Sequence, residues 1–167
     1  MAGQEAKRRR GDLLGIVALV GVTALTATVS TASSDYDSTW FKTLRKPRWE
    51  PSGAVIGPVW AVIYACTALA GSLLWRERDK HDLKGLAGLF AVQYLLNYLF
   101  TPLLTLRRSL ALSTTDSAVL HLVVDAMVIV AWPIRRAAAL LLIPYSAWTL
   151  FATILSWRVW SLNAERD

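Results

Sequence analysis

Five apolar runs joined by short polar connectors constrain this chain most strongly. The runs cover residues 13–32, 55–75, 86–105, 117–132 and 137–160. A helix needs about 20 apolar residues to cross the roughly 30 Å hydrocarbon core of a bilayer. Because backbone groups in hydrocarbon must pair with one another, only helices and closed barrels span membranes, and these runs lack the alternation of barrel strands. The sequence therefore predicts an all-α integral membrane protein, a bundle of five transmembrane helices.

Composition supports the same class of protein. Of 167 residues, 54% are hydrophobic and 18% are charged, whereas a soluble domain is about 45–50% apolar and about 25% charged. The connectors are short, so residues 1–167 are expected to form a single multi-pass domain, which we assign to the cell membrane. The net charge of +6 comes mainly from Lys and Arg at the ends of the runs, which suits a lipid bilayer as partner and not nucleic acid. The basic residues are nearly balanced between the two sides, so the orientation stays open.

The first run has a second interpretation, because it follows the basic residues Lys7 to Arg10. A secretory signal has a hydrophobic core of about 7–15 residues, and this run is nearer 20. We therefore expect a retained span. Cleavage near Ala32 would leave four spans.

The loop 34–54 is rich in aromatic, proline and basic residues. Tryptophan favours the membrane–water boundary, and Pro47 and Pro51 prevent a long regular helix. Two interpretations follow: the loop is an aromatic anchor at the interface, or it is a lid over a ligand cavity between helices.

Polar residues inside the runs define two further features. Gln93, Asn97 and Thr101 recur every four residues, so they share one helical face that should point inward. They serve either as hydrogen bonds between helices or as polar contacts for a ligand. His121 and Asp125 also share a face, which favours either a structural contact or a proton-linked role.

No metal site is expected, because His81 lies in a hydrophilic turn and Cys66 and His121 are far apart in sequence. The chain also lacks a nucleophile–base pair, a phosphate loop and a dinucleotide fingerprint, which argues against ordinary hydrolase or oxidoreductase chemistry.

Several motifs resemble those of the TspO/MBR family, the tryptophan-rich sensory proteins and translocator proteins, also called peripheral-type benzodiazepine receptors. The family signature WY-x-x-L-x-KP-x-W-x-PP…VW-x-x-LY is similar to the segments Trp40-Phe41, Lys46-Pro47-Arg48-Trp49-Glu50-Pro51, Val59-Trp60 and Tyr64. Its later motifs Q-x-x-x-N-x-x-W and PY-x-x-W-x-x-FA are similar to Gln93, Asn97 and Phe100, and to Pro144-Tyr145, Trp148 and Phe151-Ala152, with Asn163 near the closing Asn. The resemblance covers all five runs.

The resemblance implies a five-helix membrane protein that binds porphyrins in a cavity under the first loop. It places these residues in the cavity wall: Phe41, Trp60, Tyr64, Asn97, Phe100, Trp148, Ala152 and Leu155. No cofactor would be required, and a porphyrin or haem would be the ligand. Aromatic walls suit a flat macrocycle, and its carboxylates would need cations, for which Arg45 and Lys46 are the candidates. Lys42 and Arg48 are assigned to lipid headgroups.

Some positions depart from the family pattern. Ser52 replaces the second proline, Phe100 replaces a tryptophan, and Ser156 stands where an asparagine is usual. Family members in some cases bind sterols or drugs, but Trp157-Arg158 lacks the tyrosine of a sterol-type pattern, so sterol binding is not predicted.

The leading functional hypothesis is a porphyrin-binding or tetrapyrrole-binding sensor, regulator or transporter. One alternative, implied only by the resemblance, is a light- and oxygen-dependent porphyrin-degrading enzyme in which Trp60 and Trp148 react. Another is a structural membrane protein without a small ligand. Small residues at Gly85, Ala87, Gly88 and Ala91 also predict a homodimer contact.

Overall fold

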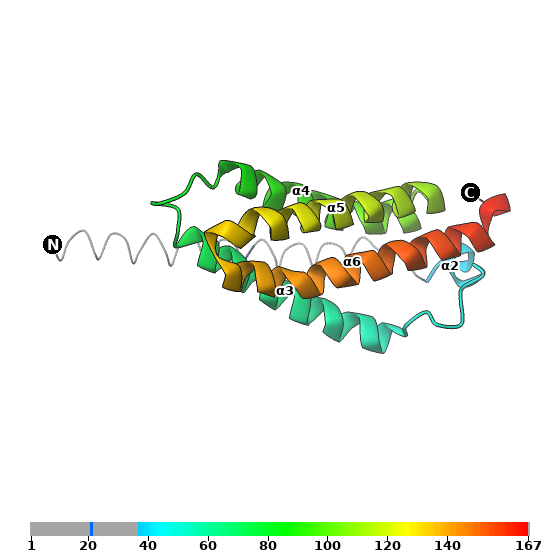
Figure 1. Cartoon of the computed structure of the whole chain (residues 1–167). Helices are drawn as coiled ribbons and strands as arrows, with labels where there is room; N and C mark the ends of the chain where they lie inside the picture. The colour runs from blue at the N-terminus through cyan, green and yellow to red at the C-terminus, as the bar shows by residue number, and fades with distance from the viewer. Residues whose placement is uncertain (1–20, 22–36, 167) are drawn as a thin grey trace.

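The computed structural model describes Gly21 and residues 37–166. The predicted span 13–32 therefore lies outside the described residues, apart from Gly21. Four long helices form the bundle (Figure 1): α3 (Gly53–Trp75), α4 (Lys84–Thr105), α5 (Leu110–Ile134) and α6 (Arg136–Leu162). Each is long and apolar enough to cross a membrane. A short helix α2 (Thr39–Lys42) lies in the loop before α3, a single 3-10 turn η1 (Ala164–Arg166) follows α6, and the described residues contain no strand.

The predicted runs 55–75, 86–105 and 137–160 agree closely with α3, α4 and α6, whereas the expected bounds 117–132 for the fourth run were too narrow. The helix α5 begins at Leu110, where the Ser109 side chain accepts a hydrogen bond from the Leu112 N–H. Its first turns contain Ser113, Asp116 and Ser117, which are buried in the bundle. The polarity of Ser113 and Asp116 placed them outside the predicted run, but they belong to the inward face of the helix. The helix ends at Ile134, one residue after Pro133 and close to the expected end at 132.

The helices are ordered α3, α6, α5, α4, with α6 packed against both α3 and α5, and α5 packed against α4. At the end that carries the α3–α4 connector and the α5–α6 turn, the bundle is closed by a cluster of buried apolar residues. Its buried members are Ala70, Leu74, Leu86, Phe90, Met127, Ala131, Ala138, Ala139 and Leu142. We call this cluster the packed half.

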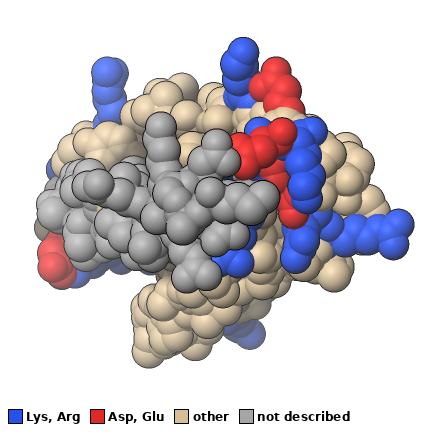
Figure 2. All heavy atoms as spheres, turned by 90° about the vertical axis from the view of Figure 1, so that its left-hand side faces the viewer, with Lys and Arg blue, Asp and Glu red and all other residues tan. Residues whose placement is uncertain are grey.

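The outer surface of this end is charged, and Figure 2 shows basic and acidic side chains close together there. In the α3–α4 connector, Glu77 forms ion pairs with Lys80 at 3.1 Å and with Arg135 of the α5–α6 turn at 3.3 Å. The hydrogen bond from Lys80, together with the nearby positive charges, lowers the pKa of Glu77. The connector is thus a solvated polar end, as its sequence predicts.

Candidate functional site

The other half of the bundle contains a cavity of about 860 Å³, within the range of about 300–1,000 Å³ that small-molecule sites occupy. It lies between α3, α4, α5 and α6 and reaches the loop before α3. All eight residues that the resemblance places in a cavity wall line it: Phe41, Trp60, Tyr64, Asn97, Phe100, Trp148, Ala152 and Leu155. Residues from four separate segments of the sequence therefore converge on one cavity.

An aromatic cluster forms the wall at the inner end of the cavity. The ring of Trp60 lies 5.3 Å from the ring of Tyr64 and meets Tyr145 and Trp148 edge-on at 6.0 and 6.5 Å between centroids. Trp148 in turn contacts Phe151 at 5.2 Å. Such offset and edge-on pairs are worth about 0.5–1.5 kcal/mol beyond area burial. The cluster joins α3 to α6 and presents ring faces and edges to the cavity.

A chain of hydrogen bonds separates the cavity from the packed half. The Tyr64 hydroxyl donates to Asn97 Oδ1 at 3.0 Å, and Asn97 Nδ2 donates to the Tyr145 hydroxyl at 2.9 Å. Tyr145 then donates to Gln93 Oε1 at 2.8 Å. This Tyr64–Asn97–Tyr145–Gln93 network links α3, α4 and α6, which confirms the interhelical interpretation of Gln93 and Asn97. Asn97 also lines the cavity, so its contact with a ligand stays a prediction.

Tyr145 is a site residue that the sequence analysis did not single out. It is 1% exposed, donates and accepts within the network and packs against Trp60. Its position in the Pro144-Tyr145 motif was the signal that could have identified it, together with the need of a buried tyrosine hydroxyl for a partner.

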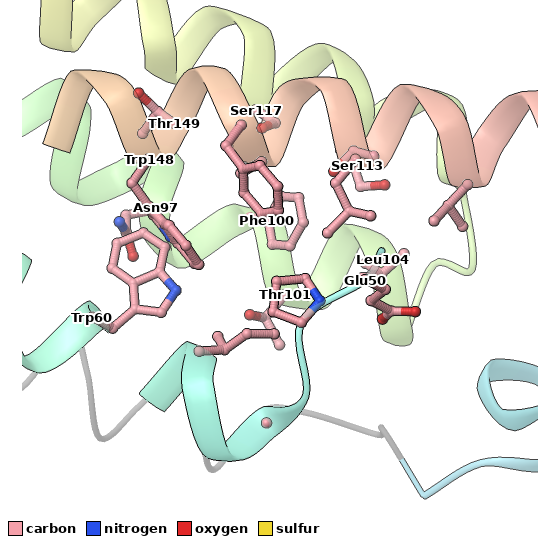
Figure 3. A pocket seen from close by; sticks show the side chains of 18 of the residues that line it. Glu50, Trp60, Asn97, Phe100, Thr101, Leu104, Ser113, Ser117, Trp148 and Thr149 are labelled. Atoms are coloured by element: carbon pink, nitrogen blue, oxygen red, sulfur yellow. The ribbon is translucent and has the colours of Figure 1, made fainter. Parts of the chain in front are cut away.

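The loop before α3 forms the mouth of the cavity. The Glu50 N–H donates to the Pro47 carbonyl at 3.1 Å, so the chain turns between these residues and brings Glu50 back to Lys46. The two side chains form an ion pair with 3.1 Å between Lys46 Nζ and Glu50 Oε1. The Lys46 ammonium also lies 4.0 Å from the centroid of the Phe41 ring. In the view of Figure 3, Glu50 and Leu104 lie toward one end of the cavity, and Trp60 and Asn97 lie toward the other.

The two candidate cations differ in position. Lys46 lines the cavity. In the part of the chain that the structure describes, Arg45 is not one of the lining residues, and it is exposed. The backbone of Arg45 is held by two hydrogen bonds to Asn163, which we call the clamp. Asn163 accepts from the Arg45 N–H at 2.9 Å and donates to the Arg45 carbonyl at 2.8 Å. This contact fixes the loop to the end of α6 and leaves Lys46 as the cation that faces the cavity. The sequence analysis missed both the clamp and the Lys46–Glu50 pair.

His121 and Asp125 do contact each other, at 3.6 Å between Nε2 and Oδ2. The Ser146 hydroxyl donates to Asp125, and His121 Nδ1 lies 3.3 Å from Thr149 Oγ1. The pair thus bridges α5 and α6, as the structural interpretation expected, and a proton-linked role stays a prediction. Across the described ranges, no three His, Cys, Asp or Glu side chains come together as metal ligands.

The small residues at the start of α4 are exposed. This group contains Gly85, Ala87, Gly88 and Ala91. A β-carbon added at Gly85 or Gly88 would meet no atom within 4 Å. The surface is open to close approach by another helix, and the homodimer stays a prediction.

Known proteins are similar to this chain over most of its length. A family model described as TspO/MBR family matches residues 14–161. The tryptophan-rich protein TspO of Bacillus cereus is 32% identical over 135 residues, which cover 81% of this chain and 88% of the relative. The human translocator protein is 31% identical over 126 residues, 74% of this chain and 75% of the relative. Protein CrtK of Rhodobacter capsulatus is 28% identical over 125 residues, 74% of this chain and 78% of the relative.

Proposed function

The chain belongs to the TspO/MBR family and is a multi-pass integral membrane protein, and from this premise we propose that its cavity binds a flat, hydrophobic ligand of the porphyrin or tetrapyrrole type. One observation supports the proposal above all: the eight expected wall residues line a single cavity. The chain would act as a sensor, regulator or transporter of that ligand.

The chemistry of the cavity suits such a ligand. The rings of Trp60 and Trp148 offer stacking surface, and each aromatic contact contributes about 0.5–1.5 kcal/mol beyond area burial. Asn97 adds a polar group at the inner end, and Lys46 places a cation at the mouth. The loop then serves as a lid over the cavity, the second of its two interpretations.

We further propose that the cavity forms part of a five-helix bundle and that this bundle associates as a homodimer. Residues 13–32 would add a fifth span to the four described helices, because they are apolar and about as long as a bilayer requires. Two copies would associate through the exposed small residues at the start of α4, where helix backbones can approach closely.

A titration with protoporphyrin IX tests the proposal. The purified full chain in lipid nanodiscs should shift the porphyrin absorbance saturably, at one site per chain. Ala152→Trp fills the cavity and should abolish the saturable phase. Leu150→Trp, on an exposed position of the same helix, is the control and should bind normally. Absorbance changes that never saturate, or equal binding by both variants, would contradict the proposal.

The contact between Trp60 and Trp148 favours a second candidate, light- and oxygen-dependent porphyrin degradation. Their rings meet at the cavity wall, 6.5 Å apart. An illuminated porphyrin transfers energy to oxygen, the excited oxygen adds to the Trp60 indole as a peroxide, and this peroxide would then transfer oxygen to the macrocycle beside it. Illumination in air should then consume the porphyrin in the presence of the wild-type chain faster than with Trp60→Phe. Equal rates, or loss of porphyrin without oxygen, would exclude this activity.

A further inference from the structure

The charges at the mouth bear on which ligands the cavity accepts. Among the residues that the structure describes, the charged side chains in the cavity wall are Lys46 and Glu50. They lie at the mouth as an ion pair, with side chains 31% and 24% exposed. The mouth therefore presents one cation and one anion to a ligand that enters beneath the loop.

The Lys46 ammonium is already satisfied on two sides. Glu50 accepts from it at 3.1 Å, and the Phe41 ring lies 4.0 Å from it. A ligand carboxylate that approached Lys46 would also approach Glu50, and two like charges at an interface disfavour each other. A carboxylate that used a remaining N–H donor of the ammonium would still lie close to Glu50 and be repelled by it. An ester or amide at the same place meets no such repulsion, because it is uncharged and still accepts a hydrogen bond.

We propose that Glu50 is a specificity-determining residue, and that it directs the cavity towards tetrapyrroles whose polar edge is uncharged and away from those with two free carboxylates. This inference rests on the proposed binding of a tetrapyrrole. The turn from Pro47 to Glu50 holds the glutamate in this place, and the clamp between Asn163 and Arg45 holds the turn against α6. The selecting charge thus sits on a fixed segment of the mouth.

Two porphyrins with the same macrocycle provide the test: protoporphyrin IX, with two carboxylates, and its uncharged dimethyl ester. The ester partitions more strongly into lipid, so the informative quantity is how a variant changes the ratio of the two dissociation constants. Glu50→Gln should tighten diacid binding by about tenfold and leave ester binding unchanged. Lys46→Met, which leaves Glu50 without its cation, should weaken diacid binding more than ester binding.

The control is the second ion pair of the same loop. Asp37 and Lys42 lie 2.9 Å apart, both are largely exposed, and neither lines the cavity. Asp37→Asn removes an equal charge and should change neither dissociation constant.

The outcomes separate this inference from the proposed function. If Glu50→Gln changes both constants equally or neither of them, the role of Glu50 is refuted and the tetrapyrrole site stands. If neither porphyrin binds saturably to the wild type, the proposed ligand class is refuted, and this inference with it.

Discussion

The two halves of the bundle lie on either side of the Tyr64–Asn97–Tyr145–Gln93 network. They differ in how completely side chains fill the space between the helices. In the packed half, Ala131, Ala138 and Ala139 are fully buried, and small residues let helices approach closely. In the cavity half, Trp60 and Trp148 stand between the helices, and a space of about 860 Å³ remains. Side chains of mixed size fill the space between the helices in the packed half, whereas in the other half aromatic and small residues line a space that they do not fill.

The largest expected effect comes from adding the same side-chain volume to each half and comparing the stability of the two variants. Ala139→Leu places three extra carbons where the side chain is 0% exposed and fully packed. It should lower the free energy of unfolding by about 1–3 kcal/mol. Ala152→Leu adds the same carbons to the cavity wall and should leave the melting temperature near that of the wild type while weakening protoporphyrin binding. Equal destabilisation by the two variants would mean that the cavity half is packed as tightly as the other.

Removing hydrogen bonds from the network between the two halves should give the next largest loss of stability. Tyr145→Phe removes two hydrogen bonds of the network, and Tyr64→Phe removes one. At about 0.6 kcal/mol for a hydrogen bond between membrane helices, the expected losses are about 1.2 and about 0.6 kcal/mol in unfolding from detergent. A Tyr64→Phe variant as unstable as Tyr145→Phe would show that the network does not work as a series of separate bonds.

Sequence patterns predicted the helices well where one local signal sufficed. The apolar runs located α3, α4 and α6, and the spacing of Gln93 and Asn97 predicted an inward face. The start of α5 was missed, because polar residues such as Ser113 and Asp116 occur both on buried helix faces and in solvated connectors. Only their burial in the folded bundle distinguishes the two cases.

The cavity was predictable for a different reason. Its wall residues follow from motifs that resemble a family, not from periodicity. The mouth was less predictable, because its contacts depend on how a loop without regular structure folds back. Asn163 holds Arg45 across 118 positions of sequence, and no local pattern indicates such a contact.

Two tryptophans of a single helix should differ in their effect on ligand affinity. Trp60 and Trp75 both belong to α3, but Trp60 lines the cavity and Trp75 lies at the last residue, beyond the packed half. At 1.5 Å per residue, about 22 Å separates them. Trp60→Phe keeps a ring but loses indole area, and it should weaken protoporphyrin binding by about 1 kcal/mol, roughly fivefold. Trp75→Phe should leave the affinity unchanged. Equal effects would place the ligand elsewhere.

The clamp at the mouth should affect opening more than stability. Asn163→Ala removes the hydrogen bonds to both backbone groups of Arg45. The loop lines the mouth of the cavity and contributes no residue to the packed half, so the melting temperature should change only slightly. If the loop acts as the proposed lid, porphyrin should dissociate faster in stopped-flow measurements. Ser161→Ala, in the last turn of the same helix, is the matched control because its hydroxyl bonds only within that turn. An unchanged dissociation rate in Asn163→Ala would show that the loop does not limit release.

The smallest effect should come from the ion pairs outside the packed half, and its sign follows from the pKa of Glu77. Lys80 and Arg135 favour the ionised carboxylate and lower this pKa in the folded chain. The stabilisation is therefore present above the unfolded pKa of about 4.3 and is lost as the pH falls through the lower, folded value. Because the side chains of both cations are about half exposed or more, screening by water and salt keeps the effect small. The melting temperature of the wild type should slightly exceed that of Glu77→Gln at neutral pH, and the two should converge in acid. A difference that persists after Glu77 is protonated would mean that the side chain stabilises the turn by packing and not by charge.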